Sequence, residues 1–166
     1  GDPRRTAIVE ATPEIRLEDL IPKEETIIMD TNSGYIKRIP LTTYRMQRRG
    51  GKGIIGIETK EEDYIVDLFV TSTHDYVLFF SNMGKVYRLK AYEIPEGSRY
   101  SKGKAIINIL PKLEAGERIN ATIPVKEFDD AHYLVFATKR GVVKKTVLSA
   151  FSNIKIQGLM CLPAAT

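Results

Sequence analysis

The sequence repeats itself three times, and this repetition restricts the possible folds more than any other feature. Each copy contains an apolar run, a four-residue turn that ends in glycine, and a second run that carries basic residues. The turns occupy residues 31–34, 81–84 and 138–141, and each begins with a hydroxyl residue. The glycines are 50 and then 57 residues apart. This period is typical of folds in which each copy forms one small, propeller-like blade.

The runs beside each turn are rich in β-branched and aromatic residues, which favours strands. First strands are predicted at 26–29, 76–80 and 133–137, and second strands at 35–38, 85–88 and 142–145. Glycine-led runs at 53–57, 103–109 and 158–162 predict third strands, and 64–70 and 119–123 predict fourth strands. A helical period is nowhere sustained. We therefore predict an all-β fold with about three four-stranded repeats, the third incomplete.

The predicted organisation is a lead-in followed by one domain. Residues 1–24, with prolines among charged residues, are predicted to be a linker that docks Leu17, Leu20 and Ile21 on the body. A single β domain is expected at 25–162, with blades at about 25–71, 75–124 and 132–162, and a tail at 163–166. No apolar run approaches ~18 residues, so no transmembrane helix is expected. A single cysteine and the lack of an apolar leader favour a cytoplasmic location.

Residues that could carry catalysis are few. His74 and His132 both precede the first strand of a copy, which favours a role in turns over acid–base chemistry. The acidic cluster Glu58, Glu61, Glu62 and Asp63 is predicted to be a solvated loop rather than a cation site. Cys161 lies in an apolar run, as an inert buried thiol would. Without nucleophile or nucleotide-binding motifs, we expect no catalytic residues, no metal site and no cofactor.

Basic residues, in contrast, recur with the repeat. The net charge is only +4, but the cations fall on matching strands and on the loops that follow them. On strands they are Lys37, Arg38, Lys85, Arg88, Lys144 and Lys145, and on loops Arg45, Arg48, Arg49, Lys52, Lys90, Arg99, Lys102, Lys104 and Lys155. If the copies surround an axis, these cations form a stripe that can bind duplex DNA through its phosphates. The alternative is that strand lysines face solvent and protect sheet edges.

The densest basic stretch is Gln47-Arg48-Arg49-Gly50-Gly51-Lys52-Gly53. Its glycines allow the backbone to approach a partner closely, and its cations and free N–H groups can bind phosphate oxygens. The matching loop of the second copy, residues 99–104, is also basic and contains glycine but has a different sequence. The stretch is therefore predicted to be a specialised form of a loop that the copies share.

The heptad 47–53 resembles the gyrase A box, the hallmark of the C-terminal domain of the DNA gyrase A protein family. The flanking residues 18–22, 34–38 and 40–45 are similar to the first blade of that domain, and the resemblance extends over residues 2–154. It implies a β-pinwheel, a propeller-like disc whose blades exchange strands. The family has about six blades, so the sequence corresponds to a truncated, partial disc.

The resemblance also implies a function. A basic rim would bend and wrap double-stranded DNA without reading its sequence, so that the holoenzyme, an A2B2 assembly with gyrase B, can introduce negative supercoils. Cleavage and ATP hydrolysis, with ATP and Mg, belong to other regions, so the chain alone is not expected to be an enzyme. Two alternatives remain, a topoisomerase-four-type domain that tunes substrate preference and a propeller-like scaffold for protein interactions.

By this resemblance, Arg48, Arg49 and Lys52 contact phosphates, while Gln47 and Tyr44 hold the loop. The three glycines of the box, Gly50, Gly51 and Gly53, permit the close approach of DNA. The rim contacts implied with lower rank are Lys37, Arg38, Arg45, Lys85, Arg88, Lys102, Lys104, Lys144 and Lys145.

Overall fold

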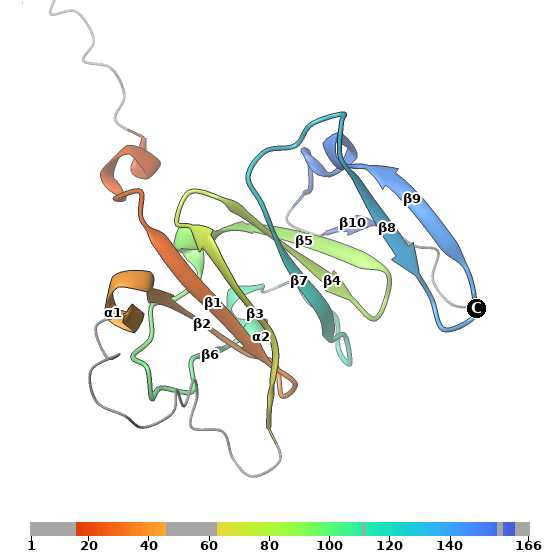
Figure 1. The fold of residues 1–166 in the computed structure, drawn as a ribbon. Coiled ribbons are helices and arrows are strands. Elements are labelled where there is room, and N and C mark those ends of the chain that lie inside the picture. The colour runs from red at the N-terminus through yellow and green to blue at the C-terminus, as the bar shows by residue number, and fades with distance from the viewer. Residues whose placement is uncertain (1–15, 46–62, 111, 156–157, 162–166) are drawn as a thin grey trace, which may run out of the picture.

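A computed structural model describes residues 16–45, 63–110, 112–155 and 158–161 (Figure 1). In chain order the elements are the 3-10 helix η1 (Leu17–Leu20), β1 (Glu25–Thr31), β2 (Tyr35–Pro40), α1 (Leu41–Arg45), β3 (Ile65–Ser72), β4 (Tyr76–Ser81), β5 (Lys85–Lys90), η2 (Ala91–Glu93), β6 (Lys104–Ala105), α2 (Ile106–Ile109), β7 (Ile119–Val125), β8 (Tyr133–Ala137), β9 (Val143–Val147), η3 (Leu148–Phe151) and β10 (Leu159–Met160). None of the helices in these ranges is long and apolar enough to cross a membrane.

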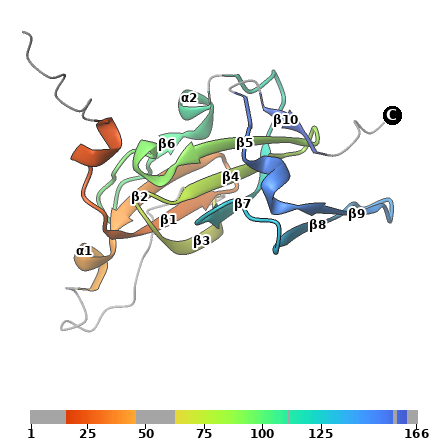
Figure 2. The same cartoon turned by 90° about the horizontal axis from the view of Figure 1, so that it is seen from above.

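The strands form three antiparallel sheets, which follow one another along the molecule (Figures 1 and 2). Their strand orders are β3-β1-β2-β6, β10-β5-β4-β7 and β8-β9. Each sheet is built on one of the hairpins that the repeat predicts. Gly34, Gly84 and Gly141 end the hairpin turns with φ values of +82°, +75° and +79°, a conformation that glycine adopts without steric cost. The predicted all-β, propeller-like fold is confirmed.

Neighbouring sheets exchange strands. β6 pairs with β2, with Tyr35 opposite Ala105, although the two strands belong to different copies of the repeat. β10 pairs with β5 in the same way, with Met160 opposite Lys85. The sheets therefore do not follow the sequence copies, because the ranges 75–124 and 132–162 each contribute one strand to the preceding sheet. The resemblance to a pinwheel implied this exchange, but the repeat alone did not.

The third strand predicted at 103–109 is wrong beyond Ala105. Ile106 donates its N–H to the Gly34 carbonyl at 2.8 Å, which is where β2 begins, so the exchanged strand has no further edge to pair with. The chain turns into the short helix α2, in which Leu110 N–H bonds to the Ile106 carbonyl at 2.8 Å. This turn buries both Ile106 and Leu110 in the core. The corresponding run of the first copy, 53–57, lies outside the described residues.

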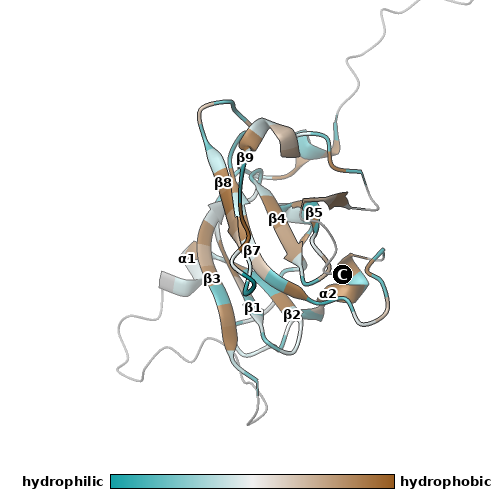
Figure 3. Cartoon of the chain, turned by 90° about the vertical axis from the view of Figure 1, so that its right-hand side faces the viewer, coloured by the Kyte–Doolittle hydropathy of each residue, from teal (hydrophilic) through white to brown (hydrophobic). Residues whose placement is uncertain are grey.

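The hydrophobic core lies between the sheets. Alternate residues of β4 point to opposite faces, as the two-residue period of a strand requires. Val77 and Phe79 pack with Ile28 of the first sheet, whereas Leu78 joins a cluster with Phe151 that faces the third sheet. Both faces of the middle sheet are therefore covered. Colouring by hydropathy shows the apolar residues concentrated along the strands (Figure 3).

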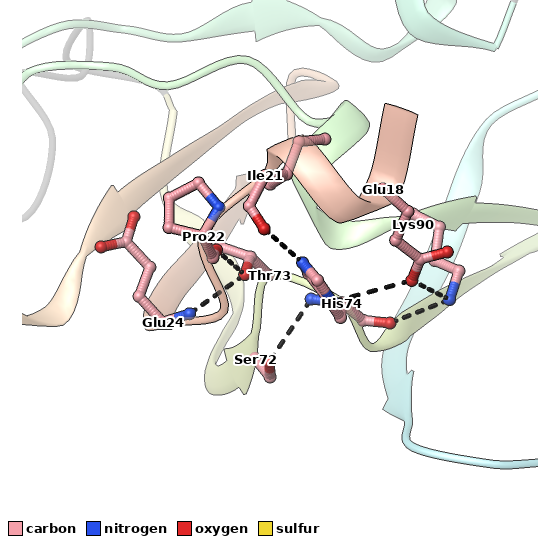
Figure 4. Close-up of polar contacts among 8 residues, drawn as sticks. All are labelled: Glu18, Ile21, Pro22, Glu24, Ser72, Thr73, His74 and Lys90. Carbon is pink, nitrogen blue, oxygen red and sulfur yellow. Dashed lines mark hydrogen bonds and ion pairs between the residues drawn. The ribbon is translucent and has the colours of Figure 1, made fainter. Parts of the chain in front are cut away.

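The lead-in docks on the turn between β3 and β4 through polar groups (Figure 4). Thr73 donates its hydroxyl to the Pro22 carbonyl at 2.8 Å and its N–H to the Glu24 carbonyl at 2.9 Å. The His74 ring nitrogen Nε2 lies 2.8 Å from the Ile21 carbonyl oxygen. The prediction that Leu17 and Leu20 dock is wrong, because these side chains are 70% and 68% exposed. Hydrogen bonds to the main chain hold this segment instead.

Candidate nucleic-acid interface

The cations predicted to form a rim fall at repeated positions on the second strand of each hairpin. Arg38, Arg88 and Lys145 each lie four residues after a hairpin glycine, and Lys37 and Lys144 lie three residues after. The structure shows that several of these side chains are engaged with other parts of the chain. They divide into cations that hold the fold together and cations that remain at the surface.

Lys37 belongs to the first group. Its side chain is completely buried, and its ammonium donates to the carbonyl oxygens of Ser98, Arg99 and Ser101 at 3.1, 2.7 and 2.8 Å. Burial lowers the pKa of Lys37 from 10.5 to about 8. The prediction that Lys37 contacts DNA on the rim is therefore wrong, because no part of its side chain reaches solvent.

Arg38 holds residues 94–97, which lead into the loop that Lys37 contacts. Its Nε donates to the Ile94 carbonyl at 3.1 Å, and its guanidinium pairs with Glu96 at 3.5 Å. Its main chain donates to the Pro95 carbonyl at 3.1 Å and accepts from the Gly97 N–H at 2.9 Å. These contacts direct Arg38 toward the segment beside β2 rather than toward solvent. The structure therefore does not support Arg38 as a DNA contact.

The loop of residues 97–103 follows this segment and overlaps the basic stretch 99–104 that matches the heptad. Two glycines let it close on β2. A Cβ on Gly103 would lie 2.4 Å from the Ile36 carbonyl oxygen, and one on Gly97 would lie 3.3 Å from the Lys37 stem. Gly103 also has a φ of +88°. This loop borders a hollow of about 340 Å³, lined by residues 95–98 and 101–104.

The other predicted rim cations lie at or near the surface with varied partners. Lys85 forms an ion pair with Glu114, and Arg88 donates to the Ser152 carbonyl. The Lys144 ammonium donates to the Cys161 carbonyl at 2.8 Å, although the residue is largely exposed. Two of these rim cations lie over a tyrosine ring, Lys102 on Tyr35 and Lys145 on Tyr133, with the nitrogen 3.8 and 4.0 Å from the ring centroid. Lys104 is exposed beside the hollow.

The heptad 47–53 and the side chain of Arg45 lie outside the described residues, so their predicted contacts stay predictions. Tyr44, three residues before the heptad, is half-buried on α1. The Arg99 guanidinium lies 5.9 Å from the centroid of its ring. The helix that leads into the heptad therefore adjoins the loop 97–103 of the next copy.

The remaining candidates from the sequence have structural roles. Asp63 accepts hydrogen bonds from the N–H groups of Ser33 and Tyr64 at 2.9 and 3.0 Å, which braces the first hairpin. His132 pairs with Asp129 at 2.7 Å in a surface turn. Glu58, Glu61 and Glu62 lie outside the described residues, and among those that are described no group of three or more ligating side chains comes together. The thiol of Cys161 is buried.

One polar cluster was missed by the sequence reasoning. Asp30 accepts from the Asp67 N–H at 2.8 Å and from the Thr122 hydroxyl at 2.5 Å, which joins the first sheet to β7 of the second. Asp67 in turn accepts from the Thr122 N–H at 3.1 Å. Burial raises the pKa of Asp30 to about 6. The sequence did carry a sign of this cluster, because each of two apolar strands contains one aspartate. A buried charge costs free energy unless it is paired.

Known proteins resemble the chain over almost its whole length. A family model described as "DNA gyrase C-terminal domain, beta-propeller" matches residues 25–72, 75–126 and 132–160. The DNA gyrase A proteins of Clostridium acetobutylicum and Halalkalibacterium halodurans are 48% and 50% identical over 162 residues. This alignment covers 98% of the chain but only 19% of each relative.

Two solved structures are also similar. The C-terminal domain of DNA topoisomerase IV superposes with a TM-score of 0.71 at 28% identity, covering 84% of this chain and 42% of that one. The DNA gyrase A C-terminal domain superposes with a TM-score of 0.63 at 31% identity, covering 82% and 43%. Both comparisons match the arrangement of sheets described above.

Proposed function

Because the chain belongs to the family of DNA gyrase C-terminal β-propeller domains, we propose that it is a non-catalytic DNA-binding module of a gyrase A protein, which bends duplex DNA along a basic rim. The observation that carries this proposal is the recurrence of surface cations with the repeat. Lys102, Lys104, Lys144 and Lys145 come from two successive copies and lie at or near the surface. Contacts of this kind bind phosphates and are independent of base sequence.

Bending determines how many such contacts are needed. Curving ~20–30 bp costs on the order of 1–6 kcal/mol, which a single exposed ion pair of about 0–1 kcal/mol does not offset. Several cations on successive blades must therefore act together. We assign Arg48, Arg49 and Lys52 of the heptad to the same track, with the heptad glycines allowing the phosphates to come close.

The proposed role in a complete enzyme is based on the likeness to gyrase A proteins. The chain spans about 19% of the length of its gyrase A relatives, so the cleavage and ATP-dependent steps are assigned to other regions. We propose that the domain wraps DNA for the A2B2 holoenzyme with gyrase B, in the cytoplasm, and so supports negative supercoiling. ATP and Mg would act in those other regions.

Duplex binding as a function of salt tests the proposal. The chain should bind a ~30 bp duplex, with log K falling linearly against log salt at about −0.9 per phosphate neutralised. Changing Arg48, Arg49 and Lys52 together to alanine should reduce the size of this slope by roughly two to three and weaken binding at least tenfold. The matched control removes three exposed cations elsewhere, Lys112, Lys126 and Lys139. Binding that is equal at low and high salt would contradict the phosphate track.

A second candidate is a topoisomerase-IV-type domain that tunes substrate preference without wrapping. The similarity to the topoisomerase IV structure favours it, since that TM-score is the higher of the two. Bending of ~100–150 bp fragments, about one persistence length of DNA, separates the two, because only a wrapping domain should bring the fragment ends together. A chain that binds no duplex at low salt would instead be a protein-interaction scaffold.

A further inference from the structure

One position of the repeat, four residues after the hairpin glycine, carries a cation in all three copies, Arg38, Arg88 and Lys145. Arg38 lies opposite Ile28, and Arg88 lies opposite Leu78. Residues that lie opposite each other in an antiparallel pair have their side chains on the same face of the sheet. Ile28 packs against the second sheet, and Leu78 packs in the cluster that faces the third. The cation at this position therefore emerges on the face that meets the next copy.

In the first two copies this cation binds the main chain of the copy that follows. Arg38 donates its Nε–H to the Ile94 carbonyl at 3.1 Å, and the Arg88 guanidinium donates to the Ser152 carbonyl. Ile94 is the C-cap residue of η2, and Ser152 is the C-cap residue of η3. Carbonyls at the end of a helix lack partners within the helix, and a basic side chain can bind them. The two arginines thus bind the same place in successive copies.

Each arginine also has a further contact that restricts its orientation. Arg38 pairs with Glu96 at 3.5 Å. The guanidinium carbon of Arg88 lies 5.0 Å from the centroid of the Tyr76 ring and 5.7 Å from that of Phe128. Phe128 belongs to the link between β7 and β8, so Arg88 contacts its own sheet, this link and the third copy together. Such contacts oppose rotation of one sheet relative to the next.

The third copy presents the same position at the surface. Lys145 is exposed, and its nitrogen lies 4.0 Å from the centroid of the Tyr133 ring. Val135, which lies opposite Lys145, is 66% exposed. Tyr133 occupies the place in its copy that Tyr76 occupies in the second copy. The contact between cation and ring is therefore retained, while the cation itself is accessible to a phosphate.

We propose that Arg38 and Arg88 are positioning residues that set the angle between successive sheets, and thereby the curvature of duplex DNA on the basic rim, without contacting phosphates themselves. This inference rests on the proposed function and gives the cations at one repeat position two roles. Bent DNA is held by contacts whose mutual arrangement imposes the bend. Loosening the angle between sheets should therefore reduce bending without removing a phosphate contact.

The angle can be measured without DNA. Spin labels introduced through Ala115→Cys, in the turn before β7, and Lys139→Cys, in the turn between β8 and β9, lie at exposed positions of the second and third copies. Double electron–electron resonance then reports the distances between the two copies. Arg88→Met keeps most of the volume of the side-chain stem but cannot donate, so it should broaden the distance distribution. Lys145→Met, at the same repeat position, should leave the distribution unchanged. A chain without the two introduced cysteines checks that the buried Cys161 takes up no label.

Bending and phosphate contact are measured separately on the unlabelled chain. The rate at which ligase circularises a ~150 bp fragment, about one persistence length, reports bending, and the salt slope reports the phosphates neutralised. At saturating protein, Arg88→Met should lower the circularisation rate roughly threefold or more and change the salt slope by less than about 0.3. Lys145→Met should reduce the size of the slope by about 0.9 and affect bending less. Arg88→Lys, which can still donate to a carbonyl, should restore part of the bending.

Each negative result has a distinct meaning. If Arg88→Met reduces the salt slope by about 0.9, or leaves the distance distribution or the circularisation rate unchanged, the positioning role is overturned and the proposed function stands. If the unmodified chain binds no duplex at low salt, the proposed function is overturned, while the distance measurement still decides whether Arg88 holds the angle. Should Arg88→Met fail to fold, Arg88→Gln, which stays polar at this half-exposed site, replaces it in both measurements.

Discussion

Buried charged residues in this domain act on its structure rather than on a ligand. Lys37 and Asp30 lie on adjacent strands of the first sheet, and both are almost completely buried. Each forms hydrogen bonds to another copy of the repeat, Lys37 to the loop 97–103 and Asp30 to Thr122. Such groups cost free energy to bury even when they are paired. They connect the sheets in a defined register and make that connection sensitive to protonation.

At the residue scale, Asp30 should make stability depend on pH. Its pKa is raised from 3.8 to about 6 in the folded chain, so the folded state binds more protons between these values. Stability from this group therefore rises as pH falls from above 6 toward 4. At about 1.4 kcal/mol per pKa unit, the effect is on the order of 2–3 kcal/mol.

Replacing Asp30 by Asn should remove most of this dependence. Urea unfolding at pH 5, 6, 7 and 8 measures it, with exposed Asp19→Asn as the control. The pKa of Asp67 is also raised by burial, so a weaker dependence of the same sign should remain. An Asp30→Asn chain with the same pH profile as the unmodified chain would rule out the assignment.

At the element scale, the lead-in is a short segment that a few polar contacts join to the body of the domain. The lead-in is held by Thr73, which is 1% exposed, and by an ion pair between Glu18 and Lys90 at 3.1 Å. These contacts differ in environment, because Thr73 bonds to main-chain groups in the interior whereas Glu18 is partly exposed. The hydrogen bonds of Thr73 should therefore contribute more to the stability of the lead-in than the Glu18–Lys90 ion pair does.

The substitutions Thr73→Val and Glu18→Gln test this ordering. Thr73→Val leaves the Pro22 carbonyl without a donor and should cost about 1–3 kcal/mol. Glu18→Gln should cost less than about 1 kcal/mol, since exposed ion pairs are screened by solvent. Urea unfolding gives both values, and hydrogen exchange at residues 21–25 should increase more for Thr73→Val. Equal or larger loss in Glu18→Gln would show that the ion pair holds the lead-in.

The sequence could predict the hairpins but not the exchange between sheets. Gly34, Gly84 and Gly141 mark the turns because the left-handed conformation is local and its residue preference is strong. β6 and β10 are two residues long, which is too short for any period to be visible. The burial of Lys37 depends on carbonyls more than 60 residues away in sequence, and a main-chain acceptor has no side-chain signature. The sequence consequently placed Lys37 and Arg38 on the predicted rim, although their side chains bind other parts of the domain.

At the scale of the whole molecule, β3 of the first sheet and β8 of the third sheet each expose apolar residues, although Met29, on the same face as Leu68, is buried. On β3, Val66, Leu68 and Val70 are exposed, while the residues between them face the second sheet. Leu68 on β3 occupies the same place in the first sheet as Thr122 on β7 does in the second. Thr122 contacts Asp30 of the preceding sheet. On β8, Tyr133 and Val135 are exposed. Exposed apolar residues that lie side by side on a strand favour association.

The chain should therefore associate with itself as concentration rises. Changing Leu68 and Val135 together to Glu should reduce this association, because a charge at either face would have to be buried on contact. Sedimentation velocity between ~10 and ~300 μM, concentrations in the range where exposed apolar surface promotes association, measures the change. Ile107→Glu, also at an exposed apolar position but on α2, is the control. An equal effect of the control would mean that the two faces have no special role.

The exchanged strands also impose an order on biosynthesis. Tyr35 in β2 pairs with Ala105, so a ribosome must release a further seventy residues before the edge of the first sheet can be covered. In the same way, the edge of the second sheet at Lys85 stays unpaired until Met160 has been synthesised. In both cases the strand that covers the edge of a sheet comes from the next copy of the repeat. During synthesis, the edge of the most recently formed sheet therefore stays unpaired until the next copy has emerged. Because such distant pairings form slowly, the edge most exposed to misassociation during synthesis moves steadily toward the C-terminus.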